Sequence, residues 1–222
     1  MSRQWPGWLI VLEGADGCGR STQTATLKAW LERRGYAVVE TGLRRSALAG
    51  DLISRAKHGN RLGRTTMSLL YATDLADELE NRVLPALQAG SVVLADRYIY
   101  ALMARALARG AEQDWVDELL GFAPQPDLTL YLQTTPEDRL QRSLAKDPHL
   151  DYWESGMDLG LSPDRFTSCL QYQNLLQAQY EALADRYGFV KVDGAAARNE
   201  THEQVREAVR RLLEGGEELA GA

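Results

Sequence analysis

The chain has 222 residues, a length that suits one compact domain, and we expect residues 1–222 to form a single domain. Hydrophobic residues make up 45% of the chain and aromatic residues 8%, which supplies a substantial core and excludes a disordered or fibrous protein. Acidic residues outnumber basic ones by 31 to 25, so the net charge is −6. This balance argues against broad binding to nucleic acid or to an anionic membrane surface, while local basic clusters remain compatible with it.

Two features of the sequence bear on location. The two cysteines, Cys18 and Cys169, are too few for a disulfide scaffold or a four-cysteine zinc site. The apolar run near the N-terminus, residues 8–12, is too short for the core of a signal sequence or for a membrane span. We therefore expect a cytoplasmic protein that does not enter the membrane.

The first predicted strand is the apolar run 8–12, which ends in a glycine-rich turn. Helical spacing follows over 22–34 and stops at Gly35, a residue type that commonly ends helices. The remaining predicted strands are 36–41, 91–95, 128–132 and 189–192, and the remaining helices are 47–56, 65–87 with a bend or end near Pro85, one starting at 134–137, and 201–213 before a frayed tail. This alternation predicts an α/β fold, with a doubly wound, mainly parallel five-stranded sheet and helices on both faces.

The turn after the first strand matches the pattern G-x-x-x-x-G-K-[ST] at every defined position but one. It reads Gly14-Ala15-Asp16-Gly17-Cys18-Gly19-Arg20-Ser21, followed by Thr22. The glycines let the backbone curl so that its N–H groups point at phosphate oxygens, and the next helix adds the positive end of its dipole. Arg20 replaces the usual Lys, so the charge is kept on a bulkier planar group. We expect residues 14–22 to bind ATP, with Ser21 reaching Mg²⁺; a plain glycine turn is the alternative.

Four stretches carry a resemblance to a known family. They are residues 12–23, residues 69–72 with Pro85 and Gly90 downstream, Asp96-Arg97-Tyr98, and residues 126–132 followed by Thr135-Pro136-Glu137. Together they resemble the thymidylate kinases, P-loop enzymes that move the γ-phosphoryl group of ATP onto dTMP. The resemblance covers nearly the whole chain. It implies a P-loop kinase fold and Mg²⁺-dependent phosphorylation of a nucleoside monophosphate by ATP.

The resemblance also implies roles for single residues. Arg97 bridges phosphates during transfer, Asp96 helps to hold Mg²⁺ through water, and Asp16 lies near the acceptor sugar. Tyr71 stands for the base-stacking Phe, and Tyr98 joins Arg97 on the acceptor side. The chemistry agrees, because fixed cations best stabilise the spreading charge of phosphoryl transfer. From the residues alone, a surface ion pair at Asp96-Arg97 and a turn-forming Asp16 are the alternatives.

The chain departs from the family pattern on the acceptor side. The Arg that reads thymine in the family is Leu75 here, and two polar positions after the Asp-Arg motif are Ala101 and Leu102. The family's Arg that grips the acceptor phosphate has no exact counterpart. We expect Arg44 or Arg45 to supply that cation, since a guanidinium pairs with phosphate through two hydrogen bonds. A pair of solvated arginines is the alternative.

The lid region differs from the family as well. Residues 150–154 resemble the lid element with Tyr152 in place of Arg, and residues 155–167 look inserted. We place the lid near 142–168 and expect Arg142 to complete the catalytic charge clamp, with Arg165 second. Exposed helix charges are the alternative reading of both arginines.

Three functions fit these residues. The leading hypothesis is an ATP-dependent nucleoside monophosphate kinase of the thymidylate kinase type, acting on dTMP. The second keeps the fold and the phosphoryl transfer but changes the acceptor, because of Leu75, Ala101 and Leu102. The third is a catalytically degenerate nucleotide-binding protein, because of Arg20 and Tyr152. The resemblance also implies a homodimer, which an apolar stripe on the 65–87 helix allows without requiring it.

Overall fold

The computed structural model describes residues 4–59, 62–135, 137, 139 and 151–220. The strands, in chain order, are β1 (Trp8–Glu13), β2 (Val38–Gly42), β3 (Val92–Asp96), β4 (Leu128–Gln133) and β5 (Val190–Asp193). The helices are α1 (Arg20–Glu32), α2 (Gly50–Gly59), α3 (Arg64–Glu78), the π-helical turn η1 (Leu79–Val83), α4 (Leu84–Gln88), α5 (Ile99–Leu107), α6 (Gln113–Leu120), the 3₁₀ turn η2 (Met157–Leu159), α8 (Arg165–Tyr187) and α9 (Arg198–Ala220). Within these residues, no helix has both the length and the apolar character needed to cross a bilayer.

The five strands form one sheet in the order β2-β3-β1-β4-β5, and every neighbouring pair is parallel. The strand carrying the glycine-rich turn, β1, therefore lies in the middle, between β3 and β4. From β1 the chain first forms β2 and β3 on one side of the sheet, and then crosses to the other side to form β4 and β5. Parallel sheets with such a switch in strand order bind ligands beyond the carboxyl ends of the strands at the switch. The ends of β1 and β3 are thus the place to look for a site.

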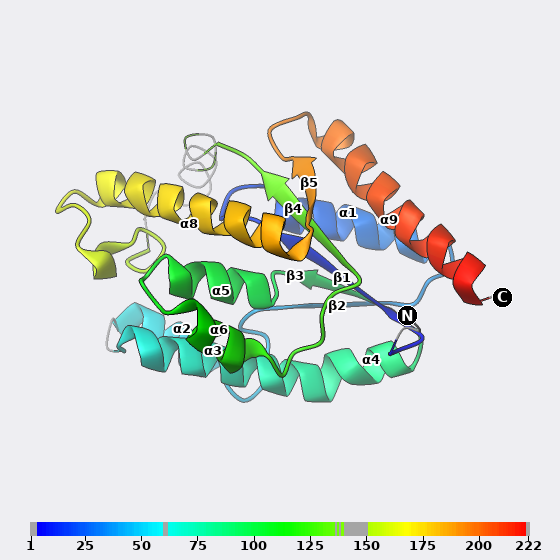
Figure 1. Ribbon diagram of the computed structural model, residues 1–222, viewed down its shortest axis with the longest axis horizontal. Helices are drawn as coiled ribbons and strands as arrows, with labels where there is room; N and C mark the ends of the chain where they lie inside the picture. The colour runs from blue at the N-terminus through cyan, green and yellow to red at the C-terminus, as the bar shows by residue number, and fades with distance from the viewer. Residues whose placement is uncertain (1–3, 60–61, 136, 138, 140–150, 221–222) are drawn as a thin grey trace.

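Both faces of the sheet are covered by helices (Figure 1). Alternate side chains of β1 divide between two cores: Leu9 and Val11 pack with α3, α5 and α8, whereas Ile10 and Leu12 pack with α1 and α9. A strand buried on both sides reads as a continuous apolar run, which is why residues 8–12 could be recognised. The predicted α/β class, the five strands and the helices on both faces are confirmed.

Several helix limits differ from the prediction. The stretch between β3 and β4, for which no helix range was predicted, forms the two helices α5 and α6, and Gly110, with a positive φ of 82°, turns the chain after α5. Near Pro85, where a bend or an end was predicted, the chain passes through the π-helical turn η1 into α4, and Pro85 lies in the first turn of α4. The closing helix continues to Ala220, so the tail predicted to fray is helical over most of its length. Near the helix start predicted at 134–137, residues 137 and 139 are helical and the N–H of Arg139 donates to the carbonyl oxygen of Thr135 at 3.1 Å, while residues 136, 138 and 140–150 lie outside the described residues.

Candidate active site

The glycine-rich turn between β1 and α1 has the backbone geometry that its sequence pattern requires. Gly14 has a φ of 139°, and a Cβ there would lie 2.8 Å from the sulfur of Cys18 and 2.9 Å from the carbonyl oxygen of Leu132. Gly19 caps α1 in the left-handed region, with φ 97°. No other residue type fits these two positions without strain, so the glycine spacing is dictated by the loop itself.

Arg20 opens α1, and its side chain folds back onto the loop. Its Nη1 donates to the carbonyl oxygens of Gly14 and Ala15, the latter at 2.7 Å, and its Nε donates to Asp96 at 2.9 Å. Burial alone would lower the pKa of Arg20, but nearby acidic groups, Cys18 and Asp96 among them, outweigh burial and raise it. The residue in the lysine position is therefore charged and held within the loop.

Ser21 and Asp96 bring two kinds of oxygen together at the carboxyl end of β3. The Ser21 hydroxyl donates to Asp96 Oδ2 at 2.8 Å, while Asp96 Oδ1 accepts from Arg20. Burial raises the pKa of Asp96, yet Arg20 and the Ser21 hydrogen bond more than compensate and leave that pKa below its ordinary value. A hydroxyl beside an ionised carboxylate suits Mg²⁺, which prefers oxygen ligands and keeps several waters. Among the described residues, no group of three His, Cys, Asp or Glu side chains could hold a metal ion.

Arg97 follows β3 with a φ of 74°, which is uncommon for a residue with a Cβ. Its Nη2 donates to Asp16 Oδ1, and its buried Nε has no hydrogen-bond partner among the described residues. Asp16 also lies 3.7 Å from Arg105 Nη2 and 3.8 Å from Arg20 Nη2. Burial raises the pKa of Asp16, but these three guanidinium groups outweigh it and hold the pKa well below its usual range. Three cations thus converge on one carboxylate.

Glu13, the last residue of β1, is fully buried and braces the turn that carries Arg97. Its Oε1 accepts the backbone N–H of Tyr98 at 2.9 Å and that of Ala101 at 3.1 Å, and the Tyr180 hydroxyl donates to its Oε2 at 3.2 Å. Burial raises the pKa of Glu13 to about 7, although the backbone hydrogen bonds act in the opposite direction. Glu13 is a positioning residue, which could have been suspected from an acid placed directly after a buried apolar strand.

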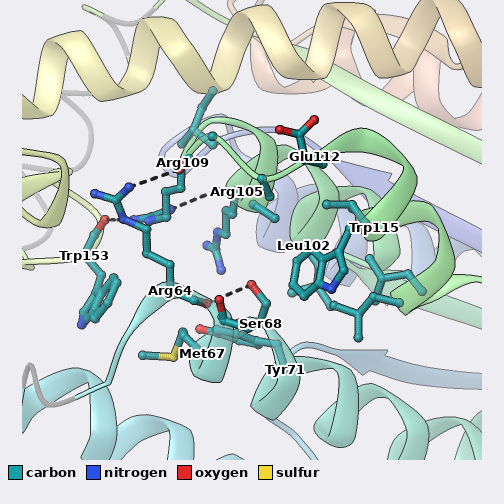
Figure 2. A pocket seen from close by; sticks show the side chains of 18 of the residues that line it. Arg64, Met67, Ser68, Tyr71, Leu102, Arg105, Arg109, Glu112, Trp115 and Trp153 are labelled. Carbon is teal, nitrogen blue, oxygen red and sulfur yellow. Dashed lines mark hydrogen bonds between the residues drawn. The ribbon is translucent and has the colours of Figure 1, made fainter.

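A cavity of about 440 Å³ adjoins the loop (Figure 2). Asp16 lies at its loop end, and apolar and aromatic side chains from α3, α5 and α6 form much of its wall, Tyr71, Leu102 and Trp115 among them. This volume falls within the range of small-molecule sites, which are mostly apolar with a few placed polar groups.

Of the residues expected to bind the acceptor, some line the cavity and others do not. Tyr71 lines the cavity and is 7% exposed. Tyr98 lies in the core with its hydroxyl bonded to the carbonyl oxygen of Pro124, and Arg44 and Arg45 are exposed after β2. None of these last three side chains is part of the cavity lining.

The residues expected in the lid and around the base also differ in where they lie. Arg142 lies outside the described residues, as does the first part of the expected lid, residues 142–150. Leu75 is buried in the core without lining the cavity, whereas Leu102 forms part of the wall. An apolar residue at the position of the family's thymine-reading Arg is therefore accommodated by core packing rather than facing a ligand.

Arg105 and Arg109 were missed by the sequence analysis, and both line the cavity. Arg109 lies just after α5 and donates to Asp158 at 3.0 and 3.2 Å, to the carbonyl oxygen of Trp153 at 2.8 Å and to the Tyr172 hydroxyl. It therefore ties the segment before α8 to the end of α5. The available signal was the pair of arginines four residues apart, which share one side of a helix.

Comparisons with known proteins show what the chain is similar to. The family model described as "Thymidylate kinase" matches residues 12–159. The chain is similar to "Probable thymidylate kinase 2" of Saccharolobus solfataricus, with 37% identity over 85% of this chain and 88% of the relative. It is also similar to "Probable thymidylate kinase" of Pyrococcus abyssi, with 30% identity over 94% and 98% of the two chains. "Thymidylate kinase" of Gloeobacter violaceus is 33% identical over 90% and 93%.

Proposed function

Because the chain belongs to the thymidylate kinase family, we propose that it catalyses the transfer of the γ-phosphoryl group of ATP to dTMP, giving dTDP and ADP. The observation that carries this proposal is the junction of the two halves of the site at Asp16. This residue belongs to the glycine-rich loop, pairs with Arg97, and lines the cavity that contains Tyr71. A donor on the loop and an acceptor in the cavity would therefore meet at the arginine cluster.

On the donor side, residues 14–22 bind the ATP phosphates. The loop backbone and the positive end of α1 favour the anion, and Arg20 supplies a fixed positive charge. In the free protein Arg20 donates to Asp96 and to two loop carbonyl oxygens. Binding of ATP would replace some of these acceptors with phosphate oxygens, which are stronger acceptors for a guanidinium.

Ser21 and Asp96 are the residues that would hold Mg²⁺, directly through the hydroxyl and through water at the carboxylate. Their side chains already lie within hydrogen-bond distance of each other. When bound, the ion neutralises charge on the ATP phosphates.

Four further predictions from the sequence are part of the proposal. They are a cytoplasmic location, a homodimer, a single domain over 1–222, and a lid near 142–168 that contributes Arg142.

On the acceptor side, Tyr71 stacks on the base and Arg97 binds the phosphate that attacks. Arg97 is not itself part of the cavity lining, but its positive φ and its bond to Asp16 fix the guanidinium beside this residue of the cavity wall. In the transition state, charge spreads over the oxygens of the transferred group, so a cation that needs no rearrangement contributes most. Arg44 and Arg45 are further candidates for the acceptor phosphate.

The proposal is tested by a coupled assay of the purified protein with ATP, Mg²⁺ and a panel of deoxy- and ribonucleoside monophosphates. We expect the highest kcat/KM for dTMP. Turnover with a different monophosphate in preference to dTMP would replace the acceptor and keep the reaction. No turnover with any member of the panel would overturn the proposal and leave a nucleotide-binding protein.

A further inference from the structure

Arg105 is the cation in the cavity whose donors are least used. It projects from α5 into the cavity toward α3, as Figure 2 shows. Its guanidinium lies 3.7 Å from Asp16 Oδ2, and the structure gives it no hydrogen bond to another described residue. A guanidinium carries five N–H donors, so most of those on Arg105 point into space that a ligand would fill.

The other cations around the cavity already have close partners. Lys57 lies 2.8 Å from Glu154, and Arg109 forms two hydrogen bonds with Asp158. Arg64 donates to the carbonyl oxygens of Asp158 and Arg109, at 2.8 and 3.2 Å. These three cations are therefore paired with groups of the cavity wall, whereas the guanidinium of Arg105 faces the interior of the cavity.

Asp16 occupies the position between Arg97 and Arg105 in the way an anionic ligand would. Arg97 pairs with its Oδ1 and Arg105 approaches its Oδ2, so one carboxylate bridges two guanidinium groups. Arg20 is the third cation of this cluster, and Asp96 is the second anion. Three positive groups therefore face two negative ones, together with the buried acid Glu13, whose carboxyl also interacts with Arg20 and Arg97 and has a pKa of about 7.

A phosphate monoester has the same bridging geometry as this carboxylate and carries more charge. Two of its terminal oxygens can each accept from a different guanidinium, in charge-assisted hydrogen bonds stronger than the present 3.7 Å contact of Arg105. Because Asp16 is 33% exposed at its side chain, it can turn away when such a ligand enters.

We propose that Arg105 binds the phosphate of the acceptor nucleotide together with Arg97, displacing Asp16, which takes that position in the free protein. This inference rests on the proposed function for the location of the acceptor. Arg105 lines the cavity and can supply a cation to the acceptor phosphate there, whereas Arg44 and Arg45 do not line the cavity. Arg105 is thereby a specificity residue: it distinguishes a nucleotide from its nucleoside.

The test is a comparison of dTMP and thymidine binding to the full chain, with protein-observed NMR for weak ligands and isothermal titration calorimetry for tight ones. For R105Q we expect dTMP binding to weaken by roughly 10- to 150-fold, the equivalent of one charge-assisted hydrogen-bond set. Thymidine binding should stay within about twofold of the wild type, because the nucleoside lacks the phosphate. R105K keeps the charge without the planar fork and should lie between the two.

R186Q is the matched control, because Arg186 also pairs with an aspartate, Asp117 at 2.7 Å, but lies outside the cavity lining. It should bind both ligands as the wild type does. Equal weakening of dTMP and thymidine by R105Q, whether from a sugar contact or a damaged cavity, would overturn the inference, as would unchanged dTMP binding. The acceptor could also be a nucleotide other than dTMP. In that case R105Q would weaken the binding of that monophosphate and not of its nucleoside, which would support the role of Arg105 and overturn dTMP as the acceptor.

Discussion

The loop end of the site and its acceptor end are built on different principles. At the loop end, the functional groups lie close together in sequence or directly after a strand, and they neutralise one another: Arg20 pairs with Asp96, and Arg97 with Asp16. At the acceptor end, the cavity is assembled from helices far apart in the chain, and much of its surface is apolar. In the proposed reaction, backbone geometry would therefore fix where phosphate is transferred, whereas side-chain packing would fix which acceptor is bound.

The largest effect is expected at the loop end, from Arg97→Ala. Removal of this guanidinium should lower kcat by about 10³-fold or more, because it acts on charge that develops in the transition state. The matched variant Arg186→Ala, on the exposed end of α8, should keep native kinetics. Steady-state assays and circular dichroism would measure both; near-native turnover by a folded Arg97→Ala protein would mean that the reacting phosphates lie elsewhere.

Asp158→Asn tests how far the acceptor end depends on packing. The Arg109–Asp158 pair is nearly buried, with side chains 10% and 8% exposed, and breaking it leaves a buried cation uncompensated. The free energy of unfolding should fall by about 3 kcal/mol. Because Arg109 also holds Trp153 against the cavity, the KM for the acceptor should rise while that for ATP stays unchanged.

Asp117→Asn provides the comparison, since its ion pair with Arg186 is solvent-exposed and such pairs contribute about 1 kcal/mol or less. Denaturant titration and initial-rate kinetics on both variants would separate stability from substrate binding. Parallel increases in both KM values for Asp158→Asn would show that the segment before α8 serves the whole site rather than the acceptor end.

Glu13→Gln should reveal the buried acid that braces the Arg97 turn. Burial raises the pKa of Glu13 from 4.5 to about 7 in the folded protein, so between these pH values Glu13 is protonated in the folded state and ionised in the unfolded state. Its contribution to stability is therefore fully present below pH 4.5 and is lost as the pH rises through about 7, a change of at most about 3 kcal/mol. The stability of the variant relative to the wild type should increase between about pH 5 and about pH 8. A difference that is constant with pH would contradict a raised pKa.

The smallest effect is expected at Tyr71, where a matched pair isolates the ring. Stacking of a base on an aromatic side chain contributes roughly 1–3 kcal/mol, so Tyr71→Ala should raise the KM for dTMP by about 5- to 150-fold. Tyr71→Phe keeps the ring and should stay near the wild type. Similar KM values for both variants would remove Tyr71 from the base site.

The same contrast explains what could be predicted from the sequence. The glycine-rich turn was recognisable because its spacing is imposed by the backbone, as the positive φ values of Gly14 and Gly19 show. The three central strands, β1, β3 and β4, followed from continuous apolar runs, whereas the edge strands β2 and β5 followed from shorter runs that include polar residues. Arg105 could not be assigned a place in advance, since the direction in which it points depends on how α5 packs against α3. The Arg109–Asp158 pair joins residues 49 positions apart, which no local pattern connects.

A crystal structure of the protein with dTMP would show whether the acceptor lies in the cavity with its phosphate at the arginine cluster. We expect the base against Tyr71, the phosphate between Arg97 and Arg105, and Asp16 turned away from both. A phosphate held by Arg44 or Arg45, or a base outside the cavity, would contradict this expectation.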